Sequence, residues 1–158
     1  MKRRRKLIGA LVASLSFPFV IASLVVAQPR PNEDYIPRLG DIMSAIQTRH
    51  VKVWYAGKAA NWELAEFELR QLKANLVEAA LLYAGIPVNN VMTMAGPMQS
   101  VGDAIEARDN KRFSKTFSEL TAACNGCHIS MARSFIVIHE PTEKQPLGDQ
   151  IFSPRSKP

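Results

Sequence analysis

The sequence lacks most of the patterns that indicate an enzyme. It contains no Ser-His-Asp set, no pair of carboxylates placed for acid-base chemistry and no phosphate-binding loop. It also has no internal repeat and no low-complexity block. Cysteine is almost absent, since the only two, Cys124 and Cys127, lie together in the stretch CNGCH with His128 directly after them. We therefore expect a protein that is not an enzyme, with its chemistry concentrated in this stretch.

The N-terminus has the features of an export signal. MKRRRK is a cationic start, residues 7–26 are apolar, and VVA is a small-residue cleavage pattern that predicts cleavage after Ala27. This predicts a signal peptide over 1–27 and a periplasmic mature protein. The alternative is an uncleaved anchor, because the apolar run is longer than the ~7–15 residues of an ordinary signal core. Only that alternative would give contact with a membrane.

A basic surface is also absent once the signal is removed. The whole chain has 20 basic and 14 acidic residues and a net charge of +6, and residues 1–27 carry five of the basic residues and no acid. The mature chain therefore keeps 15 basic and 14 acidic residues, a net charge of about +1. No basic stripe remains, so we expect no nucleic-acid partner.

Helical periodicity dominates the mature chain, with no convincing strand pattern. After an extended leader (28–35), amphipathic helices are predicted over four ranges: 36–56, 62–84, 89–108 and 111–137. Four such helices joined by short corners predict an all-α fold, an antiparallel up-down-up-down four-helix bundle, with this domain over 36–139. A proline-rich tail follows over 140–158, and Ile151 and Phe152 could dock it on the body.

Local residues set the expected corners of this fold. Gly57 is the expected C-cap of the first helix and Asn61 the N-cap of the second. Gly96-Pro97 should kink or split the third helix. The fourth helix is expected to continue until Pro141 forbids it.

The CNGCH stretch is typical of covalent haem attachment. On a helix, Cys124, Cys127 and His128 stand at i, i+3 and i+4, so all three side chains leave one face. Two thiols can then form thioether bonds to the porphyrin edge while the imidazole binds the iron. An exported chain is in a suitable compartment for this attachment. A free CxxC there would be expected to become a disulfide unless both thiols were used in another way.

Three other interpretations of CNGCH each lack a part. A thioredoxin-like CxxC should follow a strand, and none is predicted. A structural zinc needs four ligands, and outside the motif only His50 and His139 remain as the usual nitrogen or sulfur donors. A structural disulfide would leave the adjacent histidine unexplained. The sequence therefore predicts one covalent haem c, with its iron, held by Cys124 and Cys127 and ligated by His128.

With an export signal, four predicted helices and CxxCH late in the last one, the chain resembles cytochrome c′ and its six-coordinate relatives over residues 36–137. Two features differ from that family. ISMAR replaces the aromatic-Arg pair that often follows the haem histidine, and the tail is longer. The resemblance implies either a six-coordinate electron carrier or a five-coordinate protein that binds NO or CO.

The sixth iron ligand is predicted from levels along the bundle. From Lys111 to His128 the fourth helix descends roughly 25 Å at ~1.5 Å per residue. The same descent along the first helix ends four residues, about 6 Å, from Met43 and eleven residues, about 17 Å, from His50. Met43 is therefore the expected axial ligand and His50 the alternative. Met43 could also be an ordinary core methionine.

Together these expectations describe a periplasmic mono-haem cytochrome that carries electrons through a His/Met haem. The alternative is a five-coordinate gas-binding protein of the cytochrome c′ kind. The expected partner is a periplasmic redox protein, and the sequence leaves a homodimer open.

Overall fold

The computed structural model describes residues 35–142 and 152–154, and within these ranges the chain is all-α with no strand. The described helices are α1 (Leu39–Lys58), α2 (Trp62–Leu82), α3 (Val88–Met92), α4 (Ala95–Glu106) and α5 (Asn110–Ser130). The all-α prediction is confirmed. The predicted signal peptide, all of the leader except Tyr35, and most of the predicted tail lie outside the described residues.

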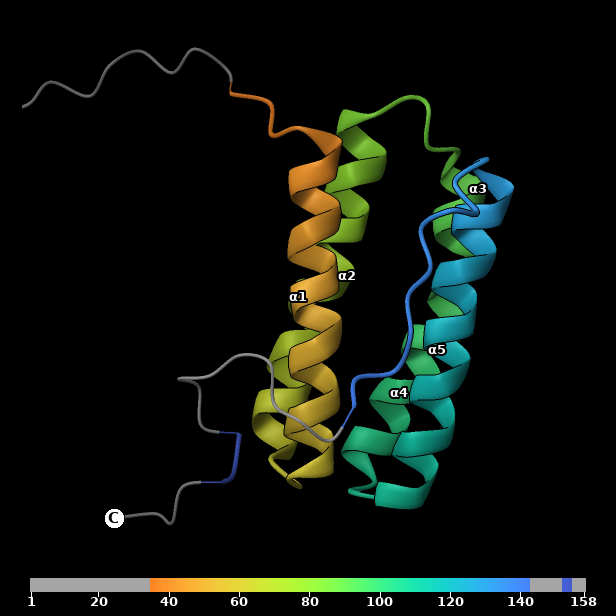
Figure 1. The fold of residues 1–158 in the computed structure, drawn as a ribbon. Coiled ribbons are helices and arrows are strands. Elements are labelled where there is room, and N and C mark those ends of the chain that lie inside the picture. The colour runs from red at the N-terminus through yellow and green to blue at the C-terminus, as the bar shows by residue number, and fades with distance from the viewer. Residues whose placement is uncertain (1–34, 143–151, 155–158) are drawn as a thin grey trace, which may run out of the picture. The chain divides into compact units, whose positions relative to one another are not determined.

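Helices α1 and α2 lie side by side, as do α4 and α5, and α2 packs on α4 while α1 touches α5 (Figure 1). A buried carboxylate ties α1 to α2. Glu68 of α2 is 2% exposed and pairs with Arg49 at 2.8 Å and with Lys52 at 3.8 Å, both on α1. These two ion pairs link α1 to α2, and removal of the cations would leave the Glu68 charge buried without a partner.

Aromatic side chains fill the core near the corner between α1 and α2. Phe113 and Phe117 of α5 are fully buried. The Trp54 ring lies 5.0 Å from that of Phe117, and the Trp62 ring 6.0 Å from that of Phe113. A Cβ on Gly57 would lie 2.2 Å from the Phe113 ring, so this glycine permits a close approach of α5 to α1.

The first helix does not end where the sequence predicts. Gly57 is not a C-cap: α1 continues to Lys58, and Ala60 takes the left-handed conformation with φ 55°. The N–H groups of Ala60 and Asn61 donate to the carbonyls of Gly57 and Ala56, which is a Schellman ending. Asn61 caps α2 as predicted, its side chain accepting from Leu64 N at 3.3 Å.

The third predicted helix is split, as expected, but not at the predicted residues. The break falls at Thr93 and Met94, between α3 and α4. Pro97 then lies in the first turn of α4, where its missing N–H has no helical partner to lose.

The last predicted helix is too long. We expected 111–137, but α5 ends at Ser130, so Phe135 lies outside the helix and is 77% exposed. Ala132 adopts φ 54°, its N–H donates to the Ile129 carbonyl, and Arg133 N–H donates to the His128 carbonyl at 2.7 Å. This second Schellman ending turns the chain sharply after the CNGCH stretch.

Beyond α5 the described chain runs back along the helices between α1 and α5 (Figure 1). Further on, Phe152 is 5% exposed and its ring lies 5.5 Å from that of Tyr55 on α1. Docking of the tail through Phe152 is therefore confirmed, while Ile151 lies outside the described residues. Within the described ranges, no helix has the length and apolar character needed to cross a bilayer.

Candidate functional site

The CNGCH residues lie in the last two turns of α5, so their predicted helical spacing is present. Cys124 and Cys127 both pack partly against the core that holds Phe117 and Leu120. Both thiols are free of disulfide bonds. The arrangement places two sulfur atoms and one imidazole on one side of a helix end.

Both thiols are in an environment that keeps them protonated. Burial raises the pKa of Cys124 to about 11, and the negative charge that a Cys127 thiolate would carry adds to the effect. Burial also raises the pKa of Cys127. A redox-active CxxC needs a thiol with a lowered pKa. The environment of these cysteines is therefore unlike that of a thiol-disulfide exchange site.

His128 has a defined tautomer. Its Nδ1 lies 2.9 Å from the backbone carbonyl oxygen of Ile136. A carbonyl oxygen can only accept, so Nδ1 carries a proton, and in the neutral imidazole the lone pair is on Nε2. A histidine prepared to bind a metal commonly has this arrangement, with one nitrogen donating to a carbonyl and the other available.

Asn125, the first of the two residues between the cysteines, holds that carbonyl in place. Its side-chain NH₂ donates to the Ile138 carbonyl at 2.7 Å, and its side-chain oxygen accepts from Ile138 N–H at 2.8 Å. This two-bond clamp attaches residues 136–138 to α5, and Ile136 can then accept from His128.

Sequence reasoning missed the clamp because residues 131–137 were expected to be helical. Only the capacity of an asparagine side chain both to donate and to accept could have suggested it.

Met43 is half-buried and packs with Met131 against a small apolar cluster of Ile42, Ala79 and Ile86. Met43 thus lies against the same cluster as the residue that follows the end of α5. Among the described residues, no hydrogen bond joins the Met43 sulfur to His128, and the two residues belong to α1 and α5, which touch each other.

His50 lies elsewhere. It is 2% exposed, its Nε2 is 2.8 Å from the Thr121 hydroxyl of α5, and its ring lies 4.5 Å from that of Phe117. The Thr121 hydroxyl donates to the Phe117 carbonyl at 3.0 Å, so it accepts from His50 Nε2–H. His50 therefore faces α5 at Thr121, almost two turns before His128.

The residues at the end of α5 fit a covalent haem. Two thiols stand three residues apart on one face, and the next imidazole presents an unprotonated Nε2 fixed by a carbonyl. Comparison with protein families, with curated proteins and with solved structures finds no match to this chain.

Proposed function

We propose that this protein is an exported mono-haem c-type cytochrome that transfers electrons in the periplasm. One observation carries the proposal: Cys124, Cys127 and His128 share one face of α5, and Nδ1 of His128 donates to the Ile136 carbonyl, which leaves Nε2 of the neutral imidazole as the ligand atom. Cys124 and Cys127 would hold the haem by thioether bonds and His128 would bind its iron. When bound, the haem supplies one-electron chemistry by alternating between Fe(II) and Fe(III).

The chain's own residues would position and protect this group. The Ile136 carbonyl orients the His128 ring and increases its basicity. The Asn125 clamp keeps that carbonyl in place. The aromatic core around Phe117 would exclude water from one side of the site.

We further propose the antiparallel up-down-up-down four-helix bundle, with α3 and α4 together as the third member. The short connections Ala59–Asn61 and Ala107–Asp109 and the packing of α1 on α2 and of α4 on α5 support it. Helices that alternate in direction can bury one apolar face each around a common core.

This arrangement supports Met43 as the sixth ligand. The hydrogen bond between His50 and Thr121 sets the level of α1 on α5. Met43 precedes His50 by seven residues, and His128 follows Thr121 by seven residues. In antiparallel helices Met43 and His128 therefore lie at one level. His50 lies about 10 Å away along the axis. Met43 is therefore the better candidate.

Attachment is tested first. After expression with the haem-maturation machinery, a haem stain of a denaturing gel should keep its colour with the polypeptide, and Cys124→Ala with Cys127→Ala should lose it. Intact mass should show the loss of residues 1–27 plus the mass of one haem. A haem that acid-acetone extracts from the wild type would contradict covalent attachment, and a full-length chain in the membrane fraction would contradict cleavage.

The sixth ligand separates the carrier from its alternative, a five-coordinate protein that binds NO or CO. We expect a low-spin oxidised spectrum that Met43→Ala converts to high spin, while His50→Gln leaves it low spin. A high-spin wild type that binds CO directly would favour the gas-binding protein. An electron carrier would exchange electrons with a redox protein of the periplasm. Analytical sedimentation would decide whether the protein is a monomer or a homodimer.

A further inference from the structure

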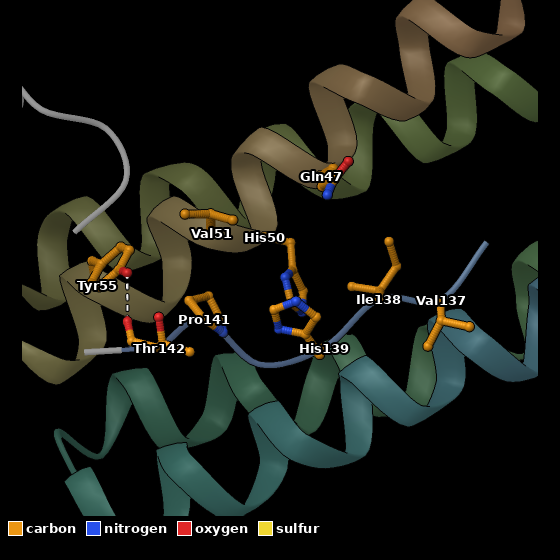
Figure 2. Close-up of a pocket in the computed structure, with 9 residues that line it drawn as sticks. All are labelled: Gln47, His50, Val51, Tyr55, Val137, Ile138, His139, Pro141 and Thr142. Atoms are coloured by element: carbon orange, nitrogen blue, oxygen red, sulfur yellow. Dashed lines mark hydrogen bonds between the residues drawn. The ribbon is translucent and has the colours of Figure 1, made fainter. Parts of the chain in front are cut away.

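The other two histidines of the chain, His50 and His139, lie away from the CNGCH stretch, around a cavity of about 220 Å³. The cavity has α1 on one wall, through Gln47, His50 and Tyr55, and the chain after α5 on the other, through His139 and Thr142. Figure 2 shows the imidazoles of His50 and His139 extending toward each other from these two walls.

His50 presents a buried lone pair that no hydrogen bond satisfies. Its Nε2–H donates to the Thr121 hydroxyl at 2.8 Å, so the proton is on Nε2 and the lone pair is on Nδ1. That Nδ1 is buried without a hydrogen-bond partner, although the residue is 2% exposed. An unsatisfied buried polar atom costs about 1–3 kcal/mol, so a ligand that used this lone pair would recover that free energy.

His139, which is exposed, also has a nitrogen without a hydrogen bond. Its Nδ1 lies 2.8 Å from the carbonyl oxygen of Glu140, which can only accept, so Nδ1 is protonated and Nε2 is left with the lone pair. Each imidazole therefore has one nitrogen fixed by an oxygen and the other free to bind. Metal-binding histidines typically have this outer support.

Two lone pairs on one cavity attract a cation. Burial, and secondly the nearby His139, lower the pKa of His50 to about 4, so His50 is neutral at pH 7 and does not supply the cation as a bound proton. Neutral imidazole is a good ligand for zinc, copper and nickel and a poor one for magnesium or calcium. The side-chain amide oxygen of Gln47, which lines the cavity, could supply a further ligand, and the open space of the cavity can hold water.

We propose that His50 and His139 form a two-imidazole binding site for a divalent transition-metal ion, separate from Cys124, Cys127 and His128. The described residues contain no group of three or more His, Cys, Asp or Glu that could hold a metal, so water must complete the coordination. Copper should bind more tightly than zinc, following the general order of divalent affinities.

The site also has a structural consequence. His50 is on α1 and His139 follows α5, so a shared ion would link the chain after α5 to the first helix. The Tyr55 hydroxyl already donates to the Thr142 carbonyl at 2.7 Å across the same cavity. A bound ion would add a second link beside it and stabilise the folded chain in proportion to its affinity.

The experiment uses the full exported protein and titrates CuSO₄ or ZnCl₂ by calorimetry. We expect one saturable site per chain. His139→Asn should weaken Cu(II) binding at least about tenfold, since even loss of an outer-shell partner commonly costs 10–100-fold. Glu140→Gln, which changes the neighbouring side chain and keeps both imidazoles, is the matched control and should bind like the wild type.

A second measurement guards against misfolding. His139 is exposed, so His139→Asn should keep the wild-type circular dichroism. The Cu(II) EPR spectrum should show nitrogen couplings from two imidazoles in the wild type and from one in His139→Asn or His50→Gln. Equal Cu(II) affinity in the wild type and His139→Asn, or the absence of a saturable site, would overturn the proposal. The cavity would then be a site for water alone. All these proteins keep Cys124, Cys127 and His128, so any metal that those residues bind contributes equally to the wild type and the variants and cancels in the comparison.

Discussion

At the scale of single residues, Asn125 holds the chain after α5 against the helix, a role that its place between two cysteines does not indicate. It makes both hydrogen bonds to Ile138 and so fixes the nearby Ile136 carbonyl, which accepts the hydrogen bond from His128 Nδ1–H. We expect Asn125→Ala to destabilise the protein by about 1–3 kcal/mol, because the Ile138 N–H and C=O lose their partners. In the haem-loaded protein it should also raise the reduction potential, since a less basic imidazole stabilises Fe(III) less.

Urea unfolding and a redox titration check both expectations. Asn90→Ala is the matched control, because Asn90 also bonds to the end of α5, at Ser130 and Met131, without touching residues 136–138. A raised potential in Asn125→Ala alone would support the clamp. Equal shifts in both variants would mean that Asn125 acts only through general stability.

His50 makes a prediction about pH. Burial lowers its pKa from 6.5 to about 4, so the folded state disfavours the charged form. Between these pH values the unfolded chain binds a proton that the folded chain does not, and stability is therefore present above pH 6.5 and lost as pH falls toward 4. The loss should reach about 3 kcal/mol.

Urea unfolding in the presence of a chelator, at pH 7.5, 5.5 and 4.5, measures this loss. His139 and Tyr55 line the same cavity, and His139 also lowers the His50 pKa. His50→Gln can keep the donation to Thr121 without titrating, so its stability should fall less over the same range. Parallel curves for the two proteins would show that His50 does not cause the acid sensitivity.

At the scale of helices, three ends adopt the Schellman pattern without glycine. Ala60, Arg108 and Ala132 take φ values of 55°, 53° and 54°. The left-handed conformation costs a non-glycine residue about 1–2 kcal/mol, partly offset by the greater chain entropy that glycine loses. We expect Ala132→Gly to raise stability by about 0.5–1 kcal/mol, as measured by urea unfolding. Ala122→Gly, in the interior of α5, should instead lower it by about 1 kcal/mol.

These same endings explain where prediction from sequence failed. Helix existence and type follow from apolar periodicity, so α2 could be predicted, and residue type predicted its N-cap, Asn61. Asp109, which caps α5, was not predicted as a cap. Helix ends were predicted from Gly57 and Pro141, because glycine and proline are the usual stop signals. The chain stops its helices with alanine and arginine instead, and no composition rule marks those positions.

The candidate site divides in the same way. The i, i+3, i+4 placement of Cys124, Cys127 and His128 needs only a helix, so it was predictable. The Ile136 carbonyl and the His50–Thr121 contact depend on where α5 ends and how α1 packs on α5. Those are properties of the tertiary structure, and the sequence patterns contain no signal for them.

At the scale of the whole molecule, the chain after α5 closes the fold by returning to α1. Phe152 is 5% exposed against Tyr55, and the Tyr55 hydroxyl donates to Thr142. These contacts bring Thr142 and Phe152, two described residues of the predicted tail, against α1. A single buried aromatic ring can supply most of the burial that keeps such a segment in place.

Phe152→Ala should therefore weaken the molecule beyond the tail itself. Large buried Phe→Ala changes cost about 3–5 kcal/mol, and a residue near the chain end should fall at or below the lower limit, about 2–3 kcal/mol. Because Tyr55 lines the cavity with His50 and His139, loss of the ring should also speed hydrogen exchange along α1 around Tyr55. Ser153→Ala, one residue along and exposed, is the control and should leave both measurements unchanged. Exchange that accelerates only beyond residue 142 would mean that the tail rests on α1 without stabilising it.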